Sequence, residues 1–207
     1  MFEVLDSELL IQAPIIALRR DTLTMPGGSI ATREIVEHYG AVAVVAVNDK
    51  GEVALVSQYR HSVGTHLLEI PAGLMDIAGE DPHKAAMREL QEEAGLKASS
   101  WTLLADHISS PGFCDEVVRI YLATDLEEVG RTIIHDDEEA EMTLQWVPLS
   151  DCVRQVLSGG ISNGIAMSAL LMANEVINHG AEARPVDTPF PLRPTAFMNR
   201  KTNAGTN

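Results

Sequence analysis

The chain of 207 residues is 45% hydrophobic and carries a formal net charge of −15. That length and apolar content suit one packed domain with short additions at its ends. The acidic balance argues against nucleic acid as a partner, because binding a phosphate backbone requires a basic surface.

Targeting signals are not expected in this sequence. Its first ten residues, MFEVLDSELL, are acidic where a signal peptide is basic. No apolar run reaches the length of about 18 residues that a membrane-spanning helix needs. Cys114 and Cys152 form neither a disulfide framework nor a metal-ligand spacing, which favours a reducing compartment. We therefore expect a cytoplasmic protein without a membrane segment.

The first 38 residues are predicted to form an amino-terminal β segment. Ile11–Leu18 and Ser29–Val36 alternate loosely between apolar and polar residues, as strands do. Between them, Met25–Gly28 contains a Pro-Gly turn signal. The basic residues Arg19, Arg20 and Arg33 lie in or beside these strands.

The main domain is predicted to cover residues 39–182. It opens with two apolar strands, Ala41–Val47 and Glu52–Tyr59, which are expected to form a hairpin across Asn48–Gly51. A third short strand, His66–Ile70, is closed by Pro71.

A helix is predicted to begin at Asp81 and Pro82, because Asp is a favoured N-cap and Pro is favoured at the first helical position. Gly95 is expected to end it as a C-cap. Glu80, just before the helix, and Arg88 within it are expected to form an ion pair that ties the preceding loop to the helix.

This helix carries Glu89, Glu92 and Glu93 at offsets of 0, 3 and 4, which share one helical face. Like charges so placed cost roughly 0.2–0.5 kcal/mol per pair in an isolated helix. A divalent cation removes that penalty, because Mg²⁺ and Mn²⁺ prefer carboxylate oxygen ligands. The cluster therefore predicts a metal site.

Beyond the helix the sequence predicts alternating strands and helices, followed by a proline-rich extended tail over residues 183–207. A sheet with helices on both sides, an α/β architecture, is the expected fold. The strands are expected at Trp101–Ile108, Val117–Ala123 and Glu141–Val147, and the helices at Asp151–Leu157 and Gly164–Ile177, the second capped by Asn163.

The helix and the loop before it resemble the Nudix box, written G-x5-E-x7-R-E-U-x-E-E-x-G-U with U an aliphatic residue. Six residues, not five, separate Gly73 from Glu80, so either the loop has an insertion or Leu74 occupies the glycine position. We favour the insertion, because Pro71–Leu74 resembles the P-A-G-L entry of the ADP-ribose pyrophosphatase branch. From Glu80 onward every specified position matches, at Arg88, Glu89, Leu90, Glu92, Glu93, Gly95 and Leu96.

The resemblance implies an α/β/α sandwich with a mixed sheet and a Mg²⁺- or Mn²⁺-dependent hydrolase acting as a homodimer. For the ADP-ribose branch, the expected products are AMP and ribose 5-phosphate. That branch has a proline about fifteen residues past the box, and Pro111 lies 15 beyond Leu96. Residues 1–38 are then expected to reach the adenosine bound by the partner subunit.

The resemblance also implies roles for individual residues. The metal ligands would be Glu89, Glu92, Glu93 and the carbonyl of Ala72. The catalytic base or extra ligand would be Glu139, with Glu138 second and Glu141 also open, although a solvated acidic loop is the simpler explanation of any one of them. The box positions Gly73, Glu80, Arg88 and Gly95 would be structural, and the substrate-binding set would be Arg33, Arg60, Glu69, Leu74, Pro111, Gly112, Phe113 and Glu116.

Several assignments have simpler alternatives. Arg60 has the planar fork that binds phosphate, but it would equally suit a surface ion pair. Glu69 would bind adenine or be a strand-edge acid, and Glu116 would bind the terminal ribose or be a solvated loop acid. The remaining functional alternatives are another Nudix substrate (a nucleotide sugar, NADH or an oxidised nucleotide), a catalytically silent nucleotide sensor, or a plain cation binder.

Overall fold

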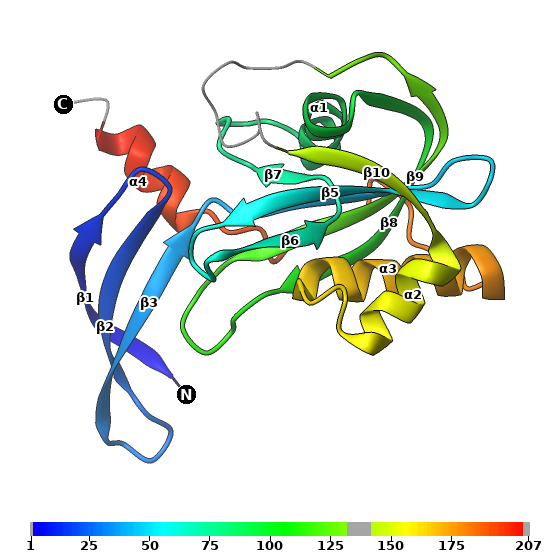
Figure 1. Ribbon diagram of the computed structural model, residues 1–207. Coiled ribbons are helices and arrows are strands. Elements are labelled where there is room, and N and C mark those ends of the chain that lie inside the picture. The colour runs from blue at the N-terminus through cyan, green and yellow to red at the C-terminus, as the bar shows by residue number, and fades with distance from the viewer. Residues whose placement is uncertain (1, 132–141, 205–207) are drawn as a thin grey trace.

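The structure is a computed structural model that describes residues 2–131 and 142–204. Its elements (Figure 1) are β1 (Glu3–Gln12), β2 (Ile16–Thr24), β3 (Ile30–His38), β4 (Ala41–Ala46), β5 (Glu52–Arg60), β6 (Thr65–Glu69), β7 (Ala72–Leu74), α1 (Pro82–Ala94), β8 (Leu96–Ile108), β9 (Val117–Glu128), β10 (Thr143–Pro148), α2 (Leu149–Ser158), α3 (Gly164–His179) and α4 (Ala196–Ala204).

Two sheets form the centre of the main domain. One has the order β7-β4-β9-β8, with β4 and β9 parallel and the other pairs antiparallel. The other is antiparallel with the order β10-β5-β6. Figure 1 shows α1 on one side of these sheets and α2 and α3 on the other. The predicted mixed sheet with helices on both sides is confirmed.

Strand β4 shows why the sequence folds into layers. All six of its residues are apolar and buried, as expected for a strand covered on both faces. Because side chains alternate along a strand, its odd-numbered residues pack in the core with α2 and α3. Its even-numbered residues pack in the core with α1.

The predicted hairpin of the first two strands of this domain is wrong. Among the described residues, β4 and β5 are joined by the bridge between Val47 and Val53, after which they separate into different sheets. The reason is competition for strand edges. The two edges of β4 pair with β7 and β9, and those of β5 pair with β6 and β10.

The amino-terminal sheet has the antiparallel order β1-β2-β3 and stands to one side of the central sheets (Figure 1). The predicted turn is confirmed, since Met25 N–H donates to Ser29 O at 2.8 Å. The single strand predicted over Ile11–Leu18 is wrong. The chain turns at Pro14, where Ala13 N–H donates to Ile16 O at 2.9 Å.

The carboxy-terminal segment is extended only in its first part, so the prediction of an extended tail to residue 207 is wrong. Pro194 is the last proline, and beyond it no residue blocks a helix. Helix α4 is held down by Phe197, which is fully buried and contacts Tyr39 edge to face with the ring centroids 4.5 Å apart.

Glu37 of β3 joins the amino-terminal sheet to helix α4. Its buried carboxylate accepts hydrogen bonds from Arg19 of β2 at 2.7 Å and from Arg200 of α4 at 2.9 Å. Burial raises the pKa of Glu37, but the hydrogen bonds from Arg200 and Arg19 outweigh burial and the pKa is lowered. A buried charge persists when it is paired in this way.

Within the described residues, no helix is long and apolar enough to span a membrane.

Candidate active site

Helix α1 begins and ends where the sequence predicts. Asp81 is the N-cap, and its carboxylate accepts the backbone N–H of His83 at 2.9 Å. Pro82 occupies the first turn, and Gly95 ends the helix with a φ of 68°. That left-handed conformation is strained for residues with a Cβ. The caps fix the helix, and so they fix which face carries the glutamates.

Arg88 lies among the acidic side chains and neutralises part of their charge. Its guanidinium contacts Glu89 at 2.6 Å, Glu92 at 3.0 Å and Glu80 at 3.2 Å. The predicted pair of Glu80 and Arg88 is confirmed. Burial lowers the pKa of Arg88, but the hydrogen bond with Glu80 and the charges of Glu89 and Glu80 outweigh burial and raise it. This neutralising role was not anticipated from the sequence.

The other side of the carboxylate face meets strand β7. The Ala72 N–H donates to Glu93 Oε2 at 2.9 Å. Gly73 lies against Glu89 so closely that a Cβ built on Gly73 would be 2.0 Å from the Glu89 carboxyl carbon. Both carboxylates are nearly buried, with 6% of Glu89 and 4% of Glu93 exposed. The absence of a side chain at Gly73 therefore allows the Glu89 carboxylate to pack against β7.

These residues suit a divalent cation by the chemistry of their donors. Three carboxylates on one helical face, beside a backbone strand, provide the oxygen ligands that Mg²⁺ and Mn²⁺ prefer. In residues 2–131 and 142–204, no group of three His, Cys, Asp or Glu side chains is arranged to hold a metal ion. Arg88 binds Glu89 and Glu92, and the Ala72 N–H donates to Glu93. The metal site stays a prediction.

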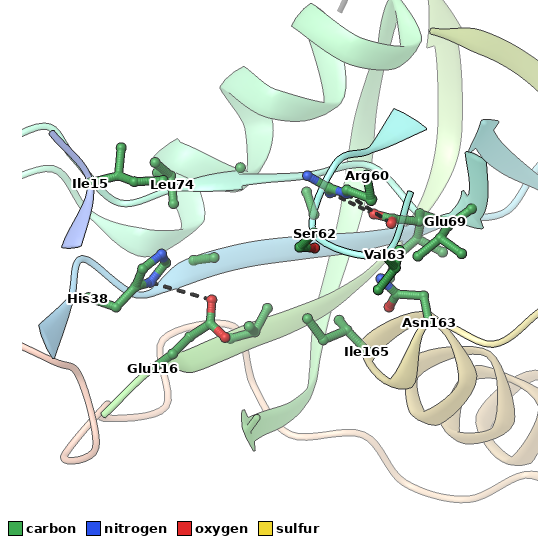
Figure 2. A pocket seen from close by; sticks show the side chains of 16 residues that line it. Ile15, His38, Arg60, Ser62, Val63, Glu69, Leu74, Glu116, Asn163 and Ile165 are labelled. Atoms are coloured by element: carbon green, nitrogen blue, oxygen red, sulfur yellow. Dashed lines mark hydrogen bonds and ion pairs between the residues drawn. The ribbon is translucent and has the colours of Figure 1, made fainter. Parts of the chain in front are cut away.

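A cavity of about 510 Å³ opens on the far side of β7. Ala72, Gly73 and Leu74 line it, so the strand that contacts Glu89 and Glu93 is also a wall of the cavity. Figure 2 shows Leu74 and His38 on one side of the cavity and Glu69 and Asn163 on the other. A substrate in this cavity would lie against β7, the strand that contacts the box glutamates.

Four of the predicted substrate-binding residues line this cavity: Arg60, Glu69, Leu74 and Glu116. Arg60 and Glu69 bind each other through two hydrogen bonds, of 3.0 and 2.7 Å. Glu116 accepts a hydrogen bond from the Ser109 hydroxyl at 2.5 Å, and its other oxygen lies 3.4 Å from His38 Nδ1.

The other predicted substrate-binding residues do not line the cavity. Arg33 lies exposed on β3 and donates to the Thr32 carbonyl at 2.7 Å. Phe113 is 59% exposed, and its carbonyl accepts the Val36 N–H at 2.7 Å, so its loop, with Pro111 and Gly112, is attached to the amino-terminal sheet. Glu138, Glu139 and Glu141 lie outside the described residues.

Sequence reasoning missed part of the cavity wall. Ile15 comes from the turn between β1 and β2, and Ser62 and Val63 come from the turn after β5. Asn163 was predicted correctly as a helix cap, but nothing in its neighbourhood pointed to a cavity. The segments meet only through the fold. For Ser62, Val63 and Asn163 the only available signal was a position near the end of a predicted strand or helix. Ile15 lay within the strand predicted over Ile11–Leu18.

The family model of the NUDIX domain matches residues 37–163, and the model described as the nucleoside diphosphate sugar hydrolase N-terminal domain matches residues 2–36. The chain therefore belongs to the Nudix family, as the box resemblance implied.

Among curated proteins, the chain is 53% identical over 200 residues to an ADP-ribose pyrophosphatase of Mycobacterium tuberculosis, covering 97% of this chain and 96% of that protein. It is 37% identical over 151 residues to an ADP-ribose pyrophosphatase of Bacillus subtilis, covering 73% of this chain and 80% of that protein. The first relationship extends over the amino-terminal sheet and the tail as well as the Nudix domain.

A solved structure described as an ADP compounds hydrolase superposes with a TM-score of 0.74 at 21% identity, covering 87% of this chain and 96% of that chain. At that identity the match demonstrates the shared fold alone. The Nudix-type α/β/α sandwich is confirmed.

Proposed function

We propose that this chain is a Nudix hydrolase that cleaves the diphosphate of ADP-ribose to AMP and ribose 5-phosphate with Mg²⁺ or Mn²⁺. The observation that carries the proposal is the shared wall: β7 lines the cavity on one side and contacts Glu89 and Glu93 on the other. The relative that is 53% identical over 97% of this chain is an ADP-ribose pyrophosphatase.

The carboxylates of Glu89, Glu92 and Glu93, with the carbonyl of Ala72, would hold the metal ion. When bound, a divalent cation supplies charge that polarises a phosphoryl oxygen and lowers the pKa of water. Arg88 keeps the acidic face compact before metal binds, since it contacts two of the three carboxylates. The chain's own part is to present these oxygens in one place beside β7, the strand that also lines the cavity.

Glu139 is the proposed base that positions or deprotonates the attacking water, and Glu138 is the second choice. Arg60 and Glu69 are proposed to bind the nucleotide half of the substrate, and Glu116 the terminal ribose. Because Glu116 is oriented by Ser109, it is ready to accept a hydrogen bond from a sugar hydroxyl.

A homodimer is part of the proposal, because the amino-terminal sheet and the residues beside it expose several large apolar side chains. Strand β1 is exposed along nearly its whole length, and exposed apolar patches mark interaction sites. By the family resemblance, a second copy would cover this sheet, and we propose that Arg33 of one protomer then reaches the substrate of its partner. The exposed side chains are Phe2, Val4, Leu5, Leu9, Ile11, Ile15, Ile16 and Ile30.

A second candidate is another nucleoside diphosphate sugar. It is favoured by the match of residues 2–36 to the N-terminal domain of nucleoside diphosphate sugar hydrolases. The proposal also includes a cytoplasmic location, supported by Cys114 and Cys152, both of which are free thiols.

A substrate panel tests the proposal. The full-length chain is incubated with Mg²⁺ and ADP-ribose, UDP-glucose, NADH or an oxidised nucleotide, and phosphate is measured after phosphatase treatment. ADP-ribose should have the highest kcat/KM, with AMP and ribose 5-phosphate as products. A preference for UDP-glucose would select the second candidate, and no turnover of any substrate would contradict both. Sedimentation of the same protein tests the dimer.

A further inference from the structure

Asn163, at the start of α3, faces the same cavity as the predicted substrate-binding residues (Figure 2). Its side-chain oxygen accepts the backbone N–H of Ala166 at 2.9 Å and so caps the helix. Since a backbone N–H requires an acceptor, this bond settles which end of the carboxamide is oxygen and which is nitrogen.

The cap leaves the amide nitrogen as a donor with a fixed direction. A side-chain amide has two N–H donors, and no described residue accepts a hydrogen bond from Asn163 Nδ2. The neighbouring polar groups of this wall are already paired, because Arg60 and Glu69 bind each other. Asn163 therefore offers an oriented donor to whatever occupies this end of the cavity.

The surroundings of that donor suit a nucleobase better than a sugar. Val63, Leu67 and Ile165 line the cavity with Asn163, and so do Arg60 and Glu69, which bind each other. The amide therefore has apolar side chains and one closed ion pair as cavity neighbours. A heteroaromatic ring combines apolar faces with ring-nitrogen acceptors at its edge, as ligand pockets with few polar groups require. Glu116, which is proposed to bind the terminal ribose, lies on the opposite side of the cavity (Figure 2).

We propose that Asn163 is a specificity-determining residue whose Nδ2 donates a hydrogen bond to an acceptor on the nucleobase of the substrate. The inference rests on the proposed function for the identity of the substrate. The contact is remote from the bond that breaks, so it contributes equally to binding in the ground state and in the transition state. Its loss should raise KM and leave kcat unchanged.

The capping role makes a clean test available. Ser and Asp are N-cap residues as good as Asn, so Asn163→Ser keeps the helix cap and removes the amide donor. Asn163→Asp keeps the shape and replaces the donor with a charged acceptor. The matched control is Asn178→Ser, an exposed position on the same helix. Melting temperatures of all three variants should equal that of the wild type, which separates recognition from a structural role.

With ADP-ribose and Mg²⁺, Asn163→Ser should raise KM about three- to tenfold, the effect of one neutral hydrogen bond, with kcat within twofold. Asn163→Asp should raise KM further, because it replaces the donor with a charged acceptor. In both variants the ratio of kcat/KM for ADP-ribose to that for UDP-glucose should fall. If KM of Asn163→Ser for ADP-ribose is unchanged, or if only kcat falls, the inference is overturned. Turnover of ADP-ribose by the wild type would still support the proposed function in that case.

Binding of AMP, measured by calorimetry, tests the same contact without turnover. AMP contains the nucleobase and lacks the terminal ribose, so Asn163→Ser should weaken its binding by a similar factor and Asn178→Ser should not. Equal affinity of wild type and Asn163→Ser for AMP, or no binding of AMP to the wild type, would overturn the inference even if ADP-ribose proved not to be the substrate.

Discussion

The Nudix box and the amino-terminal sheet differ in whether their side chains find partners within the same chain. The charged groups of the box find partners close by, since Arg88 contacts Glu80, Glu89 and Glu92 within one loop and helix. The sheet of β1, β2 and β3 instead leaves large apolar side chains exposed, Ile30 by 67% and Val4 by 59%. The charged groups of the box are thus paired within one chain, whereas the apolar side chains of the sheet would be covered only by the proposed second copy.

The difference suggests a division of labour. Residues whose partners all lie in one chain can carry the chemistry, because the reacting groups must be held in a fixed geometry. A surface shared between two chains suits binding, where small losses of geometry are tolerated. Substitutions in the box should therefore lower kcat, and those in the sheet should raise KM.

The largest effect is expected from Glu93→Gln. The amide can still accept the Ala72 N–H, so the fold should persist, but the neutral side chain loses its charge toward the metal ion. A fall in kcat of about 10²-fold or more is expected, since even substitution of a residue that only hydrogen-bonds to a metal ligand lowers metal affinity or activity roughly 10–100-fold. Steady-state kinetics at saturating Mg²⁺ checks it, with Glu175→Gln, at an exposed position of α3, as the control. Activity within a few-fold of wild type would remove Glu93 from the metal site.

Metal removal should have the next largest effect, on stability. Binding to the folded state alone adds RT ln(1 + [L]/Kd), about 2.7 kcal/mol at a hundredfold excess over Kd. For a chain of this size, that corresponds to a rise in Tm of about 5–10 °C. Thermal melts in Mg²⁺ and in EDTA measure it. Equal melting temperatures in Mg²⁺ and EDTA would mean that Mg²⁺ binds weakly or not at all and that Arg88 alone neutralises the box glutamates.

These box predictions show what the sequence determines locally. Asp81, Pro82 and Gly95 encode the ends of α1, and the spacing of Glu89, Glu92 and Glu93 then places all three on one face without reference to the rest of the fold. Prediction succeeded there because each signal acts within a few residues.

Other parts depend on distant contacts and were missed. The turn at Pro14 lacks a glycine, and β1 has no clean alternation because both of its faces are exposed. Helix α4 is fixed by Phe197 against Tyr39 and by Arg200 on Glu37, contacts between the two ends of the chain. In the same way, Asn163 and Glu69 line one cavity only once α3 has packed.

A smaller effect is expected from Gly73→Ala, which tests the contact between β7 and the box. The added Cβ would overlap the Glu89 carboxylate, and the flexible acid should move rather than the backbone. We expect a loss of activity of about tenfold or more, as for disturbed metal ligation, with little change in Tm. Gly27→Ala is the control, since nothing lies within 4 Å of a Cβ there. Full activity would show that Glu89 has no fixed place in the site.

The smallest effect, and the sharpest test of the division of labour, is expected from Arg33→Ala. In this chain Arg33 is exposed and does not line the cavity, so any influence on ADP-ribose must come through a partner subunit. Loss of one solvent-exposed contact at the adenosine end should raise KM about two- to fivefold and leave kcat nearly unchanged, because that contact is remote from the breaking bond.

The control is Arg154→Ala, an exposed arginine of α2, and sedimentation should find both variants dimeric. Dilution below the dimer's dissociation constant should raise the wild-type KM toward that of Arg33→Ala. A monomer with the wild-type KM would refute the shared site and leave the box chemistry intact. A fall in kcat with KM unchanged would break the comparison itself, because it would place the amino-terminal sheet in the chemistry.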